Sequence, residues 1–334
     1  NSNEIKIMEK LSVGVIGVGH LGKLHSKMFK EISNCNFVGV FDSNQEQAKS
    51  VADEFGVKSF DSIDELLSNV KAVSVAATTT AHYEVAKKCF EKNIHVFVEK
   101  PITASIEEGE ELVKLAKEKN LKFQVGHIER FNPGLLSLES FISDPMFIQS
   151  DRLAQFNPRG TDVAVVLDLM IHDIDIILSF IKSDVKQIDA NGVAVVSDHI
   201  DIANARIQFE NGAVANVTAS RISQKKMRKM RIFQKDHYIS LDFITGVSEV
   251  YRLQAIDEAA LPNSISFGEM GVGDRKKRLI YEQPEAKEVN ALNYELQLFV
   301  DSVLYDKKIV VSGEDGLRAL KVAEIIIQKI EQSK

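Results

Sequence analysis

Hydrophobic and polar positions follow one rhythm through the first part of the chain. Between Leu11 and about Val125, short runs rich in β-branched residues alternate with segments in which apolar residues recur every three or four positions. The runs are nearly continuous in apolar residues, as is typical of strands covered by helices on both faces. This alternation predicts a parallel, doubly wound sheet with right-handed crossovers. Its strands are expected at S-V-G-V-I-G-V, N-F-V-G-V-F, A-V-S-V-A-A, H-V-F-V and K-F-Q-V-G.

After Pro133 the rhythm changes. One helix is expected around 164–181, and the strands that follow it are joined by turn signals such as Asn211-Gly212. Consecutive strands without intervening helices form an antiparallel sheet, and the helix should cover one of its faces, so a second domain of the α+β class is predicted. Its strands are expected near 185–196, 201–210, 213–221, 228–234 and 237–243.

The end of the chain contains one irregular stretch and two helices. Residues 268–278 are Gly-rich and charged, which favours a mobile loop. Helices are expected at about 287–305 and 313–331, and the apolar stripe of the second suggests that it returns to the first domain. The prediction is therefore an α/β chain, with a first domain of residues 1–128 plus 313–334. Residues 129–312 form an α+β domain with a largely antiparallel sheet, for substrate binding and oligomerisation.

Composition and charge narrow the partners. The 334 residues are 44% hydrophobic, enough for two domains with buried cores. The net charge of −7 argues against nucleic-acid binding, which needs a basic excess or stripe, and favours a small-molecule partner. No apolar run approaches the ~18 residues of a membrane span, and the polar N-terminal stretch lacks a signal-peptide core. With only two cysteines, Cys35 and Cys89, a cytoplasmic protein without membrane association is expected.

The first predicted strand runs into G-V-G-H-L-G, whose glycines have G-x-G-x-x-G spacing. Gly17 allows a tight turn, and Gly19 lets backbone amides approach a pyrophosphate at the start of the next helix. Gly22 permits close packing of that helix on the strand. The turn, including His20 and Leu21, is therefore expected to bind a dinucleotide.

A carboxylate at the end of the second strand specifies which dinucleotide. Asp42 lies about 20 residues beyond the glycine turn, where an acidic residue binds the ribose hydroxyls. It would repel a 2′-phosphate, and Ser43-Asn44 supplies no arginine to neutralise one. NAD is therefore predicted in preference to NADP.

The stretch F-V-E-K-P-I ends another predicted strand. Ligands of open α/β sheets bind at the carboxyl ends of the strands, so Glu99 and Lys100 are expected in the site. Pro101 keeps Lys100 out of helical geometry, and a cis bond there could aim the lysine into the cleft.

The helix V-L-D-L-M-I-H-D-I-D carries Asp168 and His172 four residues apart, on one face. The other positions are mostly apolar, so the helix is expected to be largely buried, with its polar residues either hydrogen-bonded or functional. Three interpretations are open: a core pair, a His-Asp metal site of the phosphohydrolase kind, or acid–base residues of a hydride-transfer site. The glycine turn with Asp42 has no place in a metal site, so no metal is predicted.

The order and separation of G-V-G-H-L-G, T-T-T-A-H, E-K-P and D-x-x-x-H resemble those of the Gfo/Idh/MocA oxidoreductases over nearly the whole chain. The resemblance implies a Rossmann domain followed by an α+β substrate domain. It implies that Lys100, Asp168 and His172 are catalytic and that Thr78 and His82 line the cofactor cleft. The chain departs from the family at Thr79, where proline is usual, and at Val165-Val166, in a region that is usually Gly-rich and borders the substrate pocket.

Three further stretches resemble the sugar-nucleotide enzymes of the family: V-G-H-I-E-R-F-N-P, R-G-T-D and R-I-S-Q-K-K-M-R-K-M-R. The last is basic in an acidic protein, which suits a diphosphate, although a solvated turn between strands would look similar. His127, Arg130 and Arg159 are expected to bind substrate.

The expected activity is hydride transfer from a secondary alcohol of a sugar or sugar nucleotide to NAD. Either His172 or Lys100 would act as the base, and Asp168 would orient it. An inositol or free-sugar dehydrogenase and a non-catalytic, dinucleotide-sensing regulator of the same fold are the alternatives.

A homo-oligomer is also expected. The second domain's strands carry apolar residues such as Ile202, Val214 and Val217 at what looks like one face of an antiparallel sheet. Burial of that face against a second copy would give a homodimer or a homotetramer.

Overall fold

The computed structural model describes residues 9–158, 161–259 and 264–332, which form two compact units. The first unit contains the chain up to Ile128 together with Val289–Leu317, and the second contains Glu129–Glu288 together with the chain from Arg318. No helix in these described ranges is both long enough and apolar enough to cross a membrane.

The first unit is built on a parallel sheet in the order β3-β2-β1-β4-β5-β6. Val73 of β4 and Val98 of β5 are fully buried, as expected for strands covered on both faces. This confirms the predicted doubly wound fold. The strands are β1 (Leu11–Ile16), β2 (Cys35–Phe41), β3 (Lys58–Ser59), β4 (Ala72–Val75), β5 (His95–Glu99) and β6 (Phe123–Gly126).

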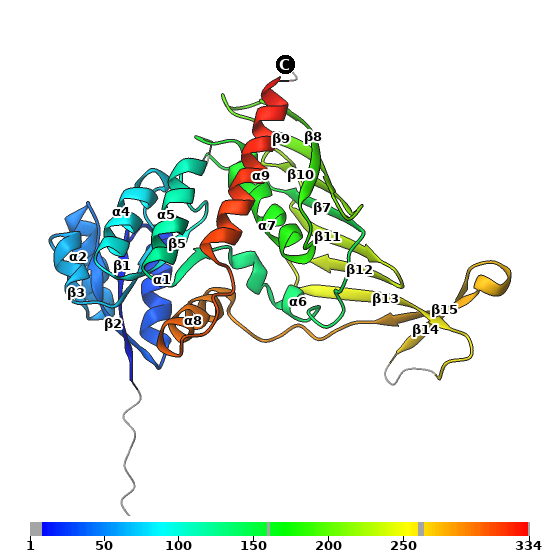
Figure 1. Cartoon of the computed structure of the whole chain (residues 1–334), viewed down its shortest axis with the longest axis horizontal. Helices are drawn as coiled ribbons and strands as arrows, with labels where there is room; N and C mark the ends of the chain where they lie inside the picture. Colours follow the sequence, from blue (N-terminus) through cyan, green and yellow to red (C-terminus); the bar gives the residue numbers. More distant parts are fainter. Residues whose placement is uncertain (1–8, 159–160, 260–263, 333–334) are drawn as a thin grey trace, which may run out of the picture. The chain divides into compact units, whose positions relative to one another are not determined.

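Helices connect these strands (Figure 1), and side-chain caps fix where several of them begin. The Ser105 side chain accepts a hydrogen bond from the Glu108 amide, and the Glu108 side chain accepts one from the Ser105 amide. From outside the alternating region, α8 (Ala291–Leu304) packs beside α1, and Phe299 contacts Phe97 of β5. The connecting helices are α1 (His20–Glu31), α2 (Gln45–Phe55), α3 (Ile63–Leu67), α4 (Thr79–Glu91) and α5 (Ile106–Glu118).

The second unit contains a sheet in the order β14-β15-β13-β12-β11-β7-β10-β9-β8, in which only β7 and β10 pair in parallel within the described residues. The largely antiparallel sheet agrees with the prediction. Its strands are β7 (Phe147–Leu153), β8 (Val185–Val193), β9 (Ile202–Phe209), β10 (Val214–Ser220), β11 (Met227–Gln234), β12 (His237–Asp242), β13 (Val247–Ala255), β14 (Ile265–Met270) and β15 (Lys277–Glu282).

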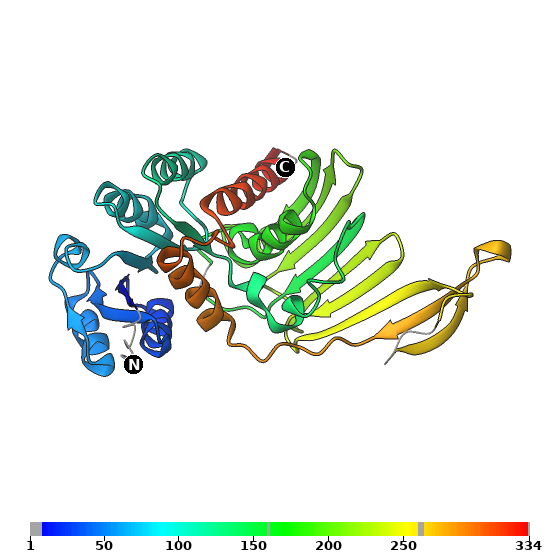
Figure 2. The same cartoon turned by 60° about the horizontal axis from the view of Figure 1, so that its bottom comes forward.

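One face of this sheet is covered by α7 (Ile171–Phe180) and the last helix, α9 (Gly313–Gln332), as Figure 2 shows. The short helices η1 (Ile128–Phe131) and α6 (Pro133–Leu136) lead from the first unit into the second.

The prediction that the last helix returns to the first domain is wrong. The α9 stripe, including Ala323 and Ile326, belongs to the hydrophobic core beneath the large sheet, and Arg318 donates a hydrogen bond to the Leu178 carbonyl in α7. The helix that joins the first unit is α8. An apolar stripe shows that a helix buries one face, but it does not identify the surface that covers that face.

The prediction of a mobile loop over 268–278 is also wrong, because this stretch forms most of an antiparallel hairpin. The hairpin contains β14, the turn η3 (Gly273–Arg275) and β15. Gly268 has φ 94° and lies where the register of β14 shifts, and Gly271 has φ 108° at the turn. These glycines therefore mark a bulge and a tight turn within paired strands.

The open face of the large sheet differs in detail from the expectation. Val214 lies three residues from Val217, so the two side chains point to opposite faces of β10. Val217 is fully buried in the core, whereas Val214 and Ile202 are half-buried on the other face. Val217 was therefore assigned to the wrong face.

Candidate active site

A groove of about 560 Å³ lies at the carboxyl edge of the first unit's sheet. The predicted residues Gly17, Gly19, His20, Leu21 and Asp42 line it, together with Thr78. The remaining lining residues are Ile16, Phe41, Ser43, Ile63, Ala76, Ala77, Ala81 and Val85.

The three glycines of the turn play different parts. Gly17 has φ 84°, and a Cβ there would lie 2.7 Å from the Ala77 backbone. A Cβ on Gly22 would lie 1.8 Å from the Gly17 carbonyl oxygen, so this glycine permits the close approach of α1. A Cβ on Gly19 would meet no atom within 4 Å, so this glycine leaves its side of the turn open. The groove therefore has the open backbone approach that a pyrophosphate needs.

Asp42 is fixed at the end of β2 by two backbone amides. Its Oδ2 accepts a hydrogen bond from Val18 N at 2.7 Å, and its Oδ1 accepts one from Asn44 N at 2.8 Å. The half-buried carboxylate still lines the groove. His20 is the only groove residue in the described chain that can carry a positive charge. This electrostatic setting suits ribose hydroxyls and disfavours a 2′-phosphate.

His82 is buried behind this groove rather than lining it. Its Nδ1 lies 2.9 Å from the Pro101 carbonyl oxygen and its Nε2 lies 3.2 Å from the Ala77 carbonyl oxygen. Burial lowers the pKa of His82, against an opposing effect of these carbonyls. The ring therefore links the loop after β4 to the loop after β5, and the expectation that it lines the cleft needs this correction.

The E-K-P stretch follows β5 at the same edge of the sheet, and the peptide bond between Lys100 and Pro101 is cis. Lys100 N donates a hydrogen bond to Glu99 Oε2 at 3.3 Å. On its other side, Glu99 Oε1 lies 3.0 Å from the Nε2 of His25, a residue that the sequence analysis did not select. The sequence feature that could have identified His25 is the position of a histidine on the buried face of the amphipathic α1.

In the second unit, the segment V-L-D-L-M-I-H-D-I-D carries four polar residues, Asp168, His172, Asp173 and Asp175, which differ in burial. The segment begins as a π-helix (η2, Val166–Met170), a form often found at functional sites, and continues as α7. Asp168 and His172 are half-buried, whereas Asp173 and Asp175 are fully buried. The expectation of a largely buried helix therefore holds for the apolar and inward acidic positions, but not for Asp168 and His172.

Arginines neutralise both buried aspartates. Arg152 makes a bidentate pair with Asp173, at 2.7 and 3.0 Å, and Arg130 makes one with Asp175, at 2.6 Å for both bonds. A fork of this kind compensates a buried charge when its geometry is good. Asp173 and Asp175 are therefore explained by these buried ion pairs.

The predicted substrate ligands have different surroundings. Arg130 uses two donor groups on Asp175, and His127 is buried in the first unit. Arg159 lies outside the described residues.

Three arginines of the basic stretch 221–231 pair with side chains elsewhere in the second unit. Arg221 is buried on Asp201 at 2.8 Å, Arg228 lies 3.3 Å from Glu129, and Arg231 donates a hydrogen bond to Gln149. Residues 227–231 of the stretch lie in β11, whereas Lys225 and Lys226 precede the strand and are exposed.

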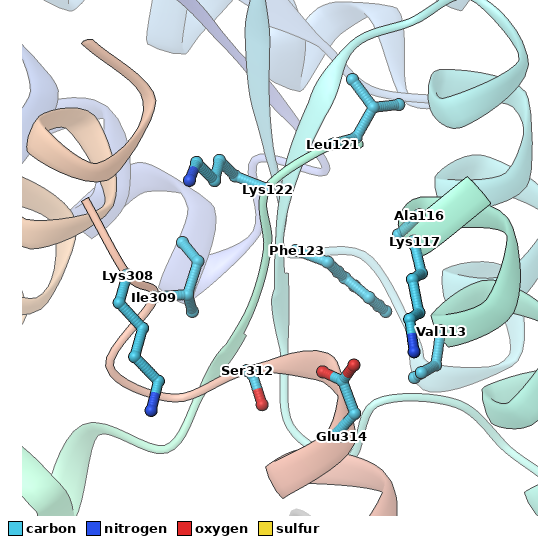
Figure 3. Close-up of a pocket in the computed structure, with 10 residues that line it drawn as sticks. All are labelled: Val113, Ala116, Lys117, Leu121, Lys122, Phe123, Lys308, Ile309, Ser312 and Glu314. Atoms are coloured by element: carbon cyan, nitrogen blue, oxygen red, sulfur yellow. The ribbon is translucent and has the colours of Figure 1, made fainter. Parts of the chain in front are cut away.

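Another cavity of the first unit, of about 430 Å³, lies at the opposite edge of the sheet (Figure 3). It includes Phe123, the first residue of β6, and Lys122, which pairs with Asp306 at 2.7 Å. Ligands of open α/β sheets bind at the carboxyl ends of the strands, so this cavity is not the nucleotide site. In the described part of the chain, His, Cys, Asp and Glu form no group of three or more that could hold a metal ion.

Comparison with known proteins agrees with this geometry. Residues 11–127 match the model of an oxidoreductase family with an NAD-binding Rossmann fold, and residues 137–239 match that of the GFO/IDH/MocA C-terminal domain. The chain is 36% identical over 317 residues to the UDP-N-acetylglucosamine 3-dehydrogenase of Acidithiobacillus ferrooxidans, covering 95% of this chain and 96% of the relative. A solved structure of that enzyme has a TM-score of 0.86 at 34% identity, covering 97% of this chain and 99% of its own.

More distant relatives share the fold. The myo-inositol 2-dehydrogenase of Thermotoga maritima is 24% identical, covering 97% of each chain. The structure of a levoglucosan dehydrogenase has a TM-score of 0.81 at 19% identity, covering 97% of this chain and 98% of its own. These matches confirm the resemblance drawn from the motifs, and the chain belongs to the Gfo/Idh/MocA family of NAD-binding oxidoreductases.

Proposed function

We propose that this chain oxidises the 3-hydroxyl of UDP-N-acetylglucosamine to a ketone with NAD as the oxidant. The observation that carries the proposal is the full-length similarity to an enzyme of that activity, 36% identity over 95% of the chain. The inositol dehydrogenase of comparable coverage is only 24% identical. The sugar-nucleotide motifs of the sequence favour the same substrate class.

The groove of the first unit supplies the cofactor-binding part of the proposal. Bound NAD would accept the hydride that leaves the sugar carbon. Gly17 and Gly19 shape the turn before α1, whose first amides would bind the pyrophosphate. The Asp42 carboxylate, already oriented by Val18 N and Asn44 N, would accept hydrogen bonds from the ribose hydroxyls.

Three side chains are proposed to act on the reacting hydroxyl: Lys100, His172 and Asp168. The hydroxyl proton must leave as the hydride does, and a histidine has a suitable pKa range for a general base. His172 is the proposed base, Lys100 would stabilise the developing alkoxide, and Asp168 would orient either one. The position of Lys100 at the carboxyl edge of the sheet and the partial exposure of Asp168 and His172 support these roles.

For the substrate, we propose Arg159 as a ligand of the diphosphate. His127 and Arg130 are proposed to support the substrate side of the site, and the burial of His127 and the pairing of Arg130 with Asp175 favour support over direct contact.

A homo-oligomer and a cytoplasmic location complete the proposal. On the open face of the large sheet, opposite its core, Phe233, Tyr238 and Tyr251 form a stacked row, and Phe147 meets Phe233 edge-on. These rings offer an apolar surface for a second copy. The two thiols are unpaired and buried, which raises the pKa of each to about 12 and suits a reducing compartment.

The decisive assay follows NADH absorbance with UDP-N-acetylglucosamine. UDP-glucose, N-acetylglucosamine 1-phosphate and myo-inositol are the comparison substrates. Reduction of the product with borodeuteride should place deuterium at carbon 3 of the sugar. Turnover of myo-inositol without turnover of the nucleotide sugar would reject the proposal, and so would label at another carbon.

A further inference from the structure

A buried polar chain joins α1, whose first residues line the groove, to the strands β4 and β5. His25 of α1 is completely buried, and its Nδ1 lies 2.7 Å from Ser74 Oγ in β4. Its Nε2 lies 3.0 Å from Glu99 Oε1 at the end of β5. The start of α1 faces the proposed pyrophosphate site, and β5 leads into Lys100. His25 therefore links the cofactor helix to the strand that presents the proposed catalytic lysine.

The Glu99 carboxylate is largely enclosed, since only 13% of its side chain is exposed. Oε1 contacts His25, and Oε2 accepts the hydrogen bond from Lys100 N. Beneath it lies Gly126 of β6, where a Cβ would come within 3.0 Å of the carboxyl carbon and both oxygens. The ring of Phe97 meets His25 edge-on, with centroids 5.5 Å apart, and holds the imidazole in its plane.

The charges around Glu99 favour its ionised form. Burial alone would raise the pKa of this carboxyl, but contact with His25 and the charge of Lys100 hold it below its ordinary value. His82 of α4 is a further titratable neighbour, and the charge of Glu99 acts to raise the pKa of His82. Without His25, the effect of burial on the pKa of Glu99 would be opposed mainly by the charge of Lys100.

We propose that His25 is a positioning residue for the dehydrogenase reaction, which acts through Glu99 to fix the turn that carries Lys100. The inference rests on the role of Lys100 in the proposed function. His25 itself touches neither substrate nor cofactor. Its polar contacts are made with Ser74 and Glu99, inside the protein.

The main test compares His25→Leu with His25→Gln. Leucine removes both polar contacts, and we expect kcat to fall roughly 10- to 100-fold, the usual effect of losing a supporting contact behind a site. Glutamine can still donate an N–H toward Glu99, so it should recover most of the turnover. The KM for the nucleotide sugar and the Kd for NAD should change less than about threefold in both.

The pH profile supplies a readout that a purely structural role would not move. Loss of His25 removes a contact that lowers the pKa of Glu99, so the carboxylate becomes protonated at a higher pH. The acidic limb of the kcat profile is set in the wild type by the proposed base His172. It should become steeper and move to higher pH in His25→Leu, because protonation of Glu99 then adds to it, and it should return in His25→Gln. His95→Leu is the matched control, because His95 begins the same strand at its opposite end and its side chain accepts a hydrogen bond from the Lys122 amide, away from Glu99. It should leave kcat and the profile unchanged.

Gly126→Ala gives a second route in case His25→Leu does not fold. It keeps every polar group but places a methyl 3.0 Å from the Glu99 carboxyl, and it should lower kcat and shift the acidic limb in the same way. A folded His25→Leu or Gly126→Ala protein with wild-type kcat and an unmoved acidic limb would overturn the inference.

A measurement without substrate separates this inference from the proposed function. Lysines are reductively methylated with ¹³C, and the Lys100 signal is assigned by its absence in Lys100→Arg. In the NAD-bound protein, the ¹³C chemical shift of methylated Lys100 should follow the ionisation of Glu99 as pH is varied. The midpoint of that titration should lie at higher pH in His25→Leu than in the wild type. An inactive wild type would reject the proposed substrate. An unchanged midpoint would reject the role of His25.

Discussion

His172 and Asp173 are neighbours in α7, and we predict that replacing them harms the protein in opposite ways. In Asp173→Ala the guanidinium of Arg152, which is only 2% exposed, loses both bonds to the aspartate. Breaking a buried pair on one side costs about 3–5 kcal/mol, because a charge stays buried without its partner. Glu129 still lies 2.9 Å from Arg152, so the expected loss of unfolding free energy is about 3 kcal/mol, the lower end of that range.

His172→Gln should behave differently, because His172 is half-buried and is the proposed general base, and the substitution leaves Asp173 in place to pair with Arg152. Removal of a general base lowers kcat by roughly 10²- to 10⁴-fold. The free energy of unfolding should fall by less than the roughly 3 kcal/mol expected for Asp173→Ala, because the buried pair of Arg152 with Asp173 stays intact. Asp173→Asn is the matched control, since it keeps the shape and one acceptor oxygen and should cost less than Asp173→Ala.

Urea unfolding gives the two free energies, and NADH formation at a temperature where all variants are folded gives kcat. Asp173→Ala should retain a kcat within a few fold of wild type. The reasoning fails if Asp173→Ala loses turnover while keeping its stability. It fails equally if His172→Gln loses stability and keeps its turnover.

Three further predictions concern the cofactor, pH and assembly. Asp42→Ala should weaken NAD binding and narrow its advantage over NADP, measured as two dissociation constants; a wild type that prefers NADP would contradict this. Because burial lowers the pKa of His82, the unfolded chain binds the proton more readily, so stability should fall as pH drops below about 6.5. Unfolding curves of His82→Asn should show that stability depends less steeply on pH below that value. The same pH dependence as in the wild type would exclude His82 as its source. Tyr238→Glu should dissociate the proposed oligomer in light scattering, and a monomeric wild type would remove that proposal.

The elements that could be predicted are those whose signals are local in the sequence. The glycine turn and Asp42 lie within one strand-helix-strand unit, and that unit forms as expected. Strands β13 to β15 were missed because most of their positions are half-buried or exposed and two of the three buried positions of β13 are polar, so apolar alternation along them is weak. The bulge glycine Gly268 then made a paired strand look like a loop.

Partners distant in sequence could not be predicted. Asp173 is neutralised by Arg152, 21 residues away, and His25 meets Ser74, 49 residues away. Such pairs depend on how elements pack, and no local pattern records them. The sequence did show that four polar residues of one helix needed an explanation. Only the burial of each side chain in the folded protein distinguishes the two groups. Asp173 and Asp175 are fully buried and are neutralised by arginines, whereas Asp168 and His172 are half-buried.

The structure also explains the two departures from the family pattern, one by helix position and the other by burial. Thr79 occupies the first position of α4, after the N-cap residue Thr78. The N–H group at this position has no acceptor within the helix, so proline, which lacks that group, is favoured there. Threonine fits the same position without the loss of a helical hydrogen bond. Val165 and Val166 are fully buried in the core of the second unit, and Val165 N donates a hydrogen bond to the Ile200 carbonyl. Their side chains therefore change the packing under the π-helix that carries Asp168, and any effect on substrate choice must act through the position of that helix.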